Sequence, residues 1–319
     1  MYGLDLSQGS VGIVIAPEID MHAFAVRNAG AEVGRSIVVI DTADFTRNFD
    51  LIARWNGGSK SGSLLLKDSR VIELSQVSGL WWRRPREPDV SDTVSPAFSE
   101  VAKKESREAL WGSLNSILPG AFNALGSSRE ANQKPVQLGK AVECGLKIPD
   151  TLISNNQEAI LEFYNFHRRS IIYKIFKGPE MGFYPTRTLS EDDLIELSSI
   201  RNSPCIFQEN IIGQFDIRVT VVGGELFSAK IEYDSSSGQV DSRATATSCV
   251  PYTLPNHINE KLLALVQGFG LVFCAIDLRK TLDGDYVFFE LNPEGQYLWT
   301  EIEAGLPISQ SIARYLTTI

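Results

Sequence analysis

The stretch 271–292 constrains the fold most, because it contains two strand-like runs on either side of an Asp-Gly pair. Both runs are rich in β-branched and aromatic residues, and Asp283-Gly284 is typical of a two-residue hairpin loop with positive φ. Such a loop places Asp277 directly opposite Glu290. Asn292 then shares their face, because side chains alternate between the two faces of a strand. We therefore expect a hairpin with three polar side chains on one face.

Two facing carboxylates should destabilise this hairpin, because like charges directly opposite each other repel. A divalent cation removes that cost. Carboxylate and carboxamide oxygens are ligands that Mg²⁺ accepts while it also binds substrate phosphates. The pattern therefore favours a platform for metal and nucleotide. Acidic residues near strand ends are also commonly solvated, and a longer loop would break the register, so this segment alone leaves both interpretations open.

The composition is that of a soluble globular protein with two or three lobes. The chain has 319 residues, of which 43% are hydrophobic and 22% charged. No apolar run has the length of a membrane span, and no signal-like N-terminus is present, so we expect a cytoplasmic protein without a membrane partner. A net charge of −9 argues against nucleic-acid binding. Four cysteines without metal-site spacing are predicted to be buried free thiols: Cys144, Cys205, Cys249 and Cys274.

The first part of the chain has the pattern of an α/β lobe. A strand, a helix and a second strand are expected within 11–40. Neither GxGxxG nor GxxxxGK[ST] occurs, which excludes the dinucleotide fingerprint and the P-loop. A further strand ends in Trp81-Trp82-Arg83-Arg84-Pro85. These side chains could bind a ligand, although packing is the commoner use of such residues.

Three short patterns predict local structure elsewhere in the chain. The runs 63–66 and 70–74 alternate on either side of Lys67-Asp-Ser and predict a small hairpin. Ser190 with Asp193 predicts the capping box of a helix. Val222-Gly-Gly-Glu225 predicts a tight hairpin turn.

Several polar residues between 134 and 243 lie where a nucleotide could meet them. Lys174 is expected inside a strand, where it needs an anionic partner or a route to water. The loop 177–182 contains two glycines and could close over phosphates through its N–H groups. The strand 205–212, with Gln208, Glu209 and Ile211, could present backbone groups to an adenine edge.

Cationic residues follow this strand. Asp216 and Arg218 share one face of the next strand, and Arg243 lies beyond a stretch rich in serine. A guanidinium binds phosphate or carboxylate in a bidentate manner and keeps its charge. A surface ion pair is the alternative use of any single arginine, and it contributes little to stability.

The polar residues discussed above follow a fixed order along the chain: Lys134, Lys174, the glycine loop, the 208–211 strand, Asp216-Ile-Arg218, Asp277 and Glu290-Leu-Asn292. This order resembles the ATP-grasp ligase superfamily over about residues 125–319. The Trp81–Pro85 strand end and the stretch 292–299 resemble the microviridin-type peptide cyclases, the graspetide synthetases. The resemblance implies an α+β fold. Its parts would be a pre-ATP-grasp α/β domain over 1–124, a central lobe covering the nucleotide over 125–207, and a C-terminal lobe with the magnesium site over 208–319.

The resemblance also implies roles for single residues. The ATP contacts would be Lys134 and Lys174 at the phosphates, Gln208, Glu209 and Ile211 beside adenine, and Asp216 at the ribose. Arg218 and Arg243 would hold the acceptor carboxylate and the transferring phosphoryl group. Asp277, Glu290 and Asn292 would hold Mg²⁺, with two ions expected.

The activity implied is ATP-dependent macrocyclisation of a ribosomally made precursor peptide with a leader and a core segment. An Asp or Glu side chain would be phosphorylated, and a Ser, Thr or Lys side chain would then close a lactone or lactam, with release of ADP and phosphate. The resemblance also implies a homodimer. Two alternatives remain open at this point: a ligase that joins a separate amine to a carboxylate, and a non-catalytic module that binds ATP or peptide.

Overall fold

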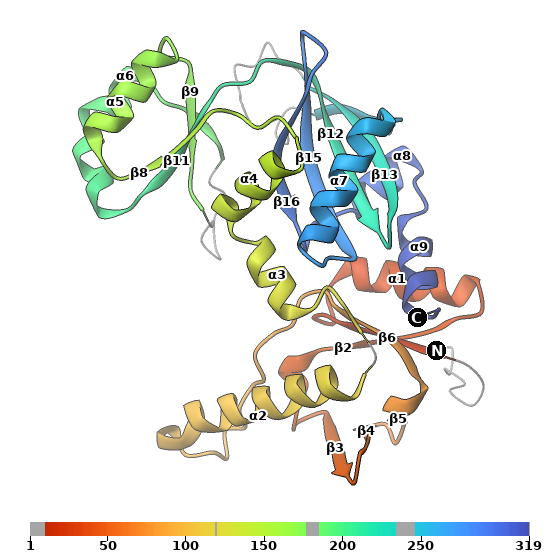
Figure 1. Cartoon of the computed structure of the whole chain (residues 1–319). Coiled ribbons are helices and arrows are strands. Elements are labelled where there is room, and N and C mark those ends of the chain that lie inside the picture. Colours follow the sequence, from red (N-terminus) through yellow and green to blue (C-terminus); the bar gives the residue numbers. More distant parts are fainter. Residues whose placement is uncertain (1–9, 119, 177–184, 234–245, 319) are drawn as a thin grey trace.

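Three lobes follow one another along the chain (Figure 1), and in the described residues the first contains two sheets and each of the others contains one. The computed structural model describes residues 10–118, 120–176, 185–233 and 246–318. The architecture mixes helices with parallel and antiparallel sheets, which confirms the predicted α+β class. Within these ranges, three short 3-10 helices lie between the larger elements: η1 (Thr42–Asp44), η2 (Leu74–Gln76) and η3 (Leu197–Asn202).

The N-terminal lobe contains the predicted strand-helix-strand unit. Its parallel sheet has the order β2-β1-β6-β7, and the Asp20 side chain caps α1 by accepting from the N–H groups of His22 and Ala23. A second, antiparallel sheet of order β3-β4-β5 lies beside it, and β3 extends the short hairpin expected from the sequence. The bounds are β1 (Val11–Ile15), α1 (Met21–Glu32), β2 (Ser36–Ile40), β3 (Phe49–Asn56), β4 (Ser59–Leu66), β5 (Val71–Glu73), β6 (Val77–Trp82), α2 (Pro96–Ile117) and β7 (Ala121–Phe122).

The central lobe is small and has short strands. Its antiparallel sheet has the order β10-β9-β11-β8, and its core gathers around Ile160, Ile171 and Phe207. The expected capping box of Ser190 and Asp193 is present at the start of α6. The bounds are β8 (Thr151–Ser154), α5 (Gln157–Phe166), β9 (Ile171–Lys174), β10 (Arg187–Thr188), α6 (Glu191–Ile195) and β11 (Cys205–Glu209).

The C-terminal lobe is a five-stranded antiparallel sheet of order β14-β13-β12-β15-β16. Alternate residues such as Ile217, Val219 and Ile276 pack against helices α4 and α7 on one face. The β12–β13 hairpin pairs Val222 with Glu225 around two glycines with positive φ, as predicted. The bounds are α3 (Leu125–Ala131), α4 (Lys134–Glu143), β12 (Gly213–Val222), β13 (Glu225–Tyr233), β14 (Ala246–Pro251), α7 (Asn256–Gly268), β15 (Phe273–Thr281) and β16 (Tyr286–Asn292).

The end of the chain returns to the N-terminal lobe. After α8 (Leu298–Ala304), helix α9 (Ile308–Leu316) packs against α1 and the parallel sheet, where Ile312 and Leu316 are fully buried (Figure 1). The approach is close, since a Cβ at Gly79 would lie 2.6 Å from the Leu316 carbonyl oxygen. The domain boundaries at 124/125 and 207/208 stay a prediction, and α9 joins the first and last of these lobes.

Within the described part of the chain, no helix is both long and apolar enough to cross a membrane. All four cysteines are free, as predicted, and Cys249 and Cys274 are buried. The predicted burial was wrong for Cys144 and Cys205, which are partly exposed. The reason is their position, because Cys144 caps the end of α4 and Cys205 begins β11.

Candidate active site

A row of charged side chains crosses three strands of the C-terminal sheet, on the face opposite α7. Asp277 of β15 lies directly opposite Glu290 of β16, which confirms the predicted pair, and Arg218 of β12 lies opposite Asp277 on the other side. Side chains directly opposite each other share a face. We call Arg218, Asp277 and Glu290 the charged row.

The turn that produces this register differs from the prediction. The loop has three residues, 282–284, because the Thr281 N–H donates to the Asp285 carbonyl (2.9 Å) and Gly284 takes a φ of +89°. This shifts the pairing near the turn by one residue. An irregularity between Asp277 and Leu278 leaves Phe289 unpaired and restores the predicted register. The two offsets cancel before the charged row.

Each carboxylate in the row is held by a cation. The Arg218 Nη1 atom donates to both oxygens of Asp277, at 2.7 and 2.8 Å. The Lys134 Nζ atom, at the start of α4, donates to Glu290. The row is therefore charge-balanced through two side-by-side ion pairs.

Desolvation and the neighbouring charges move the pKa values of the two acids in opposite directions. Desolvation raises the pKa of Asp277, Arg218 opposes this, and the Glu290 charge adds to it. Desolvation also acts to raise the pKa of Glu290, but Lys134, Lys174 and Arg218 outweigh it and lower that pKa to about 2. The repulsion expected between the facing acids therefore contributes to the raised pKa of Asp277.

Asn292 lies two residues beyond Glu290, opposite Ala275, on the same face as the row. Its Oδ1 atom accepts from the Glu294 N–H at 2.9 Å. The backbone after it lies very close to the sheet, because a Cβ at Gly295 would stand 2.2 Å from the Ala275 Cβ. Only glycine fits there, so the chain leaves Asn292 along a fixed path.

A second ion pair lies next to the row and was not predicted. Arg279 faces Asp216 and donates to both of its carboxylate oxygens, at 2.6 and 2.9 Å. Its Nη1 atom also donates to the Ile211 carbonyl at 2.9 Å, which ties the strand leaving the central lobe to the C-terminal sheet. Strand period places Arg279 on the same face as Asp277, but it does not identify Asp216, which is distant in the sequence, as the partner.

The predicted site residues of the central lobe make fewer polar contacts with the charged row than those of the C-terminal sheet. The Gln208 side chain is buried and donates to the Thr151 hydroxyl at 2.9 Å, so it holds the sheet together. Glu209 ends β11 and its N–H donates to the Asp150 carbonyl at 3.0 Å. Lys174 ends β9, and its charge is among those that lower the Glu290 pKa, so it acts on the row from the facing lobe.

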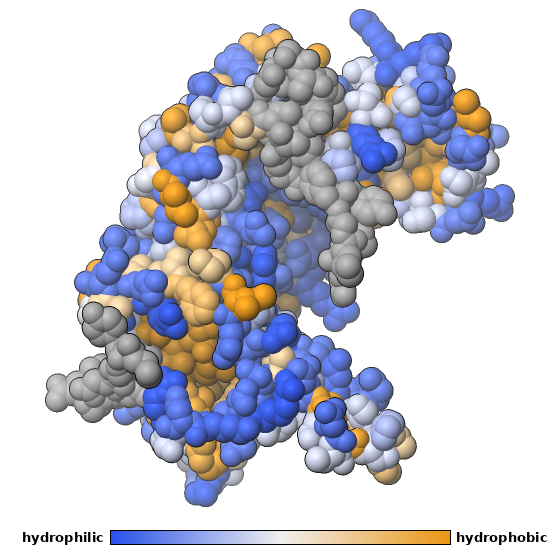
Figure 2. Space-filling model, turned by 180° about the vertical axis from the view of Figure 1, so that it is seen from behind, coloured by the Kyte–Doolittle hydropathy of each residue, from blue (hydrophilic) through white to orange (hydrophobic). Residues whose placement is uncertain are grey.

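Two predicted contributors, Arg243 and the 177–182 loop, lie outside the described residues. Trp81 and Trp82 are buried, which supports packing as the use of these aromatic rings. Seen from behind, the surface is hollowed between the central lobe and the rest of the molecule, and the hollow is largely hydrophilic (Figure 2).

The donor set of the row fits a hard divalent cation. The row offers the two carboxylates of Asp277 and Glu290, and Asn292 adds a carboxamide on the same sheet face; Mg²⁺ takes oxygen ligands of this kind together with substrate phosphates. The Asp277 pKa, raised in part by Glu290, shows a repulsion that such a cation would relieve. Asp277, Glu290 and Asn292 are therefore the residues that would hold it.

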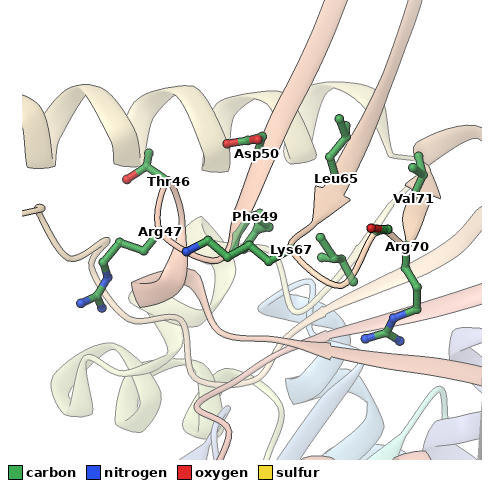
Figure 3. Close-up of a pocket in the computed structure, with 10 residues that line it drawn as sticks. Thr46, Arg47, Phe49, Asp50, Leu65, Lys67, Arg70 and Val71 are labelled. Atoms are coloured by element: carbon green, nitrogen blue, oxygen red, sulfur yellow. The ribbon is translucent and has the colours of Figure 1, made fainter.

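A separate pocket of about 340 Å³ lies on the N-terminal lobe, where β3 begins and β4 meets β5 (Figure 3). Three cationic residues line it: Arg47, Lys67 and Arg70. Arg47 forms an ion pair with Asp89, and Arg70 forms one with Asp68. The pocket belongs to a different lobe from the charged row.

Comparison with known proteins gives consistent matches over the whole chain. Residues 19–128 match a family model described as the MvdD pre-ATP grasp domain. The macrocyclase MdnC of Microcystis aeruginosa MRC, solved with its precursor peptide MdnA, is 32% identical with a TM-score of 0.83, and the match covers 97% of this chain and 100% of MdnC. The macrocyclase MdnB of the same organism is 30% identical with a TM-score of 0.77, at 97% and 100% coverage.

A more distant match shares the fold. The RiPP-associated ATP-grasp ligase of Chryseobacterium gregarium, solved with ADP and a leader and core peptide, is 24% identical with a TM-score of 0.86. That match covers 97% of this chain and 96% of the ligase. No protein with a curated functional description matches the chain.

Proposed function

This chain belongs to the graspetide synthetases, the ATP-grasp macrocyclases of ribosomally made peptides, and we propose that it closes rings in a precursor peptide with ATP and Mg²⁺. The observation that carries the proposal is the charged row beside Asn292, with Lys134 and Lys174 within reach of it. Such a face combines cation ligands with side chains that can hold phosphate and carboxylate.

The chemistry begins with a poor acyl donor. A peptide Asp or Glu carboxylate attacks the γ-phosphorus of ATP, the bond to ADP breaks, and the carboxyl oxygen gains a phosphoryl group that can leave later. A Ser or Thr hydroxyl or a Lys amine of the same peptide then attacks the acyl carbon, gives up its proton and displaces phosphate. The sum is one ring with loss of one water from the peptide, and one ATP converted to ADP and phosphate.

The residues of this chain supply positions and charges for these steps. Asp277, Glu290 and Asn292 would hold Mg²⁺, which neutralises phosphate charge during the transfer. Lys134 and Lys174 would bind phosphate oxygens, and the backbone of Glu209 and Ile211 with Gln208 would face adenine. The guanidinium of Arg218 would hold the acceptor carboxylate in line with the γ-phosphate, a positioning effect worth several kcal/mol.

Two further contacts complete the predicted site. The Asp216 carboxylate makes a bidentate pair with Arg279, so a ribose hydroxyl would share an oxygen already bound to that guanidinium. Arg243 would be the second cation at the transferring phosphoryl group.

We also infer a cytoplasmic location, where ATP and new peptides are available, and a homodimer, which light scattering of the purified protein would test.

The ion pairs of the row suggest an order of binding. The Nη1 atom of Arg218 donates to Asp277, and Lys134 is paired with Glu290. A cation that takes the two carboxylates would release both side chains toward substrate groups. Nucleotide with metal would therefore bind before the acceptor carboxylate, and peptide affinity should rise when Mg²⁺ and a non-hydrolysable ATP analogue are present.

Mass spectrometry of a candidate precursor peptide tests the proposal. Incubation with ATP and Mg²⁺ should remove one water per ring and produce ADP and phosphate. A gain in peptide mass in the presence of a free amine would instead support an intermolecular ligase, and formation of AMP would rule out the acyl phosphate route.

A further inference from the structure

The loop 293–296, which directly follows Asn292, is held by side chains from other parts of the chain. Each of its carbonyl oxygens accepts a side-chain hydrogen bond: Pro293 from Asn123 (2.9 Å), Glu294 and Gly295 from Arg83 (2.5 and 3.2 Å), and Gln296 from Arg218 (2.9 Å). Arg218 belongs to the charged row. Arg83 and Asn123 belong to the N-terminal lobe, at the end of β6 and after β7, and nothing in the chemistry above uses them.

Asn123 joins the two strands that carry the cation ligands. Its side chain is fully buried, and its backbone has a φ of +56°, which asparagine tolerates better than most residues. The Nδ2 atom donates to the carbonyls of Phe273 (2.6 Å) and Pro293 (2.9 Å), and Oδ1 accepts from the N–H groups of Val272 (3.0 Å) and Phe273 (2.9 Å). All four hydrogen-bonding positions of the amide are used. One side chain therefore fixes the start of β15 against the end of β16.

Arg83 is a costly residue in its position. Its side chain is 0% exposed, and the nearest carboxylate oxygen, that of Asp20, lies 3.7 Å away. Desolvation lowers its pKa to about 10, with partial compensation by Asp20. Among the described residues, none accepts a hydrogen bond from Nε or Nη2. Its Nη1 atom donates to the carbonyls of Glu294 and Gly295. The buried guanidinium therefore holds this loop.

The loop in turn orients a proposed cation ligand. The Glu294 N–H donates to Oδ1 of Asn292 at 2.9 Å, and the Gly295 N–H donates to the Asn292 carbonyl at 3.1 Å. A displacement of the loop would therefore turn the carboxamide away from the row. Partners that orient metal ligands in this way typically change metal affinity by about 10–100-fold when they are removed.

We propose that Arg83 and Asn123 are positioning residues for the cation site, acting on Asn292 through the 293–296 loop. The inference rests on the proposed function, because it takes Asn292 as a ligand. It assigns the N-terminal lobe a part in the reaction: the lobe sets the geometry of a site that lies on another sheet. It also gives Arg83, within Trp81-Trp82-Arg83-Arg84, a role distinct from the packing of the two tryptophans.

Direct measurement of Mn²⁺ binding tests this without turnover. Mn²⁺ serves as the probe in place of Mg²⁺, its binding is followed by electron paramagnetic resonance, and AMPPNP is present. Arg83→Lys keeps the charge but loses the guanidinium, and Asn123→Gly keeps the positive φ but loses the amide. Both should raise the Kd for Mn²⁺ by about tenfold, the low end of the range for such partners.

Trp82→Phe is the matched control. Trp82 is adjacent to Arg83 but lies on the other face of β6, where it contacts Trp111 and its Nε1 atom donates to Asn115. It should destabilise the N-terminal lobe and leave the Kd for Mn²⁺ unchanged. Thermal unfolding of all variants separates loss of stability from loss of affinity, because a merely structural role would move the unfolding temperature alone.

The outcomes separate the two hypotheses. Wild-type affinity for Mn²⁺ in both variants would overturn the positioning role while leaving the proposed function intact. Absence of Mn²⁺ binding to the wild-type protein with AMPPNP would overturn the cation site and this inference together. If Arg83→Lys or Asn123→Gly does not fold, hydrogen exchange of the wild-type Glu294 amide decides, because a loop held in this way requires a protected amide and rapid exchange would contradict the positioning role.

Discussion

The C-terminal and central lobes are both antiparallel sheets with helices beside them, but they differ in the size of their cores. In the described residues the C-terminal lobe and its helices share a cluster of twenty buried residues, and β12 alone is ten residues long. The central lobe has a cluster of six, and its longest strand has five residues. Regions with few buried contacts open at lower free energy than the global core. We therefore expect the large sheet to hold its charges in fixed positions and the small central lobe to be the part that moves when nucleotide binds.

The polar residues follow the same division. On the large sheet, Arg218, Asp277 and Glu290 are fixed by register and by ion pairs. On the central lobe, the predicted nucleotide contacts are a lysine at a strand end and backbone groups near 209–211. Pre-organised charge is effective in catalysis because it needs no rearrangement at the moment of reaction. The following predictions test this division of roles.

Loss of charge in the row should have the largest effect. Glu290→Gln should lower ring formation by about 10²–10³-fold, the range for removing one electrostatic contact to a transition state. The readout is peptide mass over time, with circular dichroism to confirm folding. Asp285→Asn is the control, because Asp285 lies on the same hairpin but pairs with Lys147 at its exposed end. Equal activity in both variants would show that the row is not the reacting centre.

Removal of Arg279 should have the next largest effect, which is a decrease in the free energy of unfolding. Arg279→Met leaves the buried Asp216 carboxylate without its bidentate partner and frees the Ile211 carbonyl. Breaking a buried pair costs about 3–5 kcal/mol, and urea denaturation measures it. The double variant with Asp216→Leu should recover part of that loss. A loss well below 1 kcal/mol would mean that this pair does not anchor the strand between the lobes.

A matched pair of core substitutions compares the lobes directly. Ile276 and Ile160 are both fully buried, the first in the large sheet and the second in the central lobe. Replacement by alanine should cost about 2–4 kcal/mol locally in each case. Ile276→Ala should lower global stability, whereas Ile160→Ala should mainly speed hydrogen exchange in the central lobe. If both variants lower the free energy of global unfolding equally, the two lobes form one cooperative unit and do not differ in the way proposed.

The smallest expected effect is on the pH dependence of stability. The folded protein holds the Glu290 pKa at about 2, below the ordinary value of 4.5. The unfolded chain therefore binds more protons in this window, so the contribution is complete above pH 4.5 and is lost as pH falls toward 2. Partial exposure reduces it to about 1 kcal/mol. Without added metal, Glu290→Gln should flatten the stability curve between pH 4.5 and 3, and an unchanged slope would contradict the ion pair with Lys134.

Local patterns predicted much of the fold because they depend on neighbouring residues. The Gly223-Gly224 turn, the capping box at Ser190 and the strand-helix-strand opening all follow from local conformational preference. The pairing of Asp277 with Glu290 was predicted correctly, but for an incomplete reason. A three-residue loop and an irregularity at Phe289 compensate each other, and strand period alone reveals neither.

Contacts between distant segments could not be predicted in the same way. The Arg279 pair, the return of α9 to the first sheet and the hold of Arg83 on the 293–296 loop each join residues far apart in the sequence. No periodicity encodes such contacts, because they follow from how whole lobes pack. The family resemblance identified the candidate ligands, while the side chains that position them required the structure.

The most direct test of the central claim is a crystal structure with AMPPNP and Mn²⁺, in which anomalous scattering locates the metal. We expect a peak in contact with the carboxylates of Asp277 and Glu290 and the carboxamide of Asn292, next to the nucleotide phosphates. Arg218 and Lys134 should no longer contact the two carboxylates in that structure. Bound nucleotide with its cation held elsewhere, and with both ion pairs of the row intact, would contradict the proposed cation site.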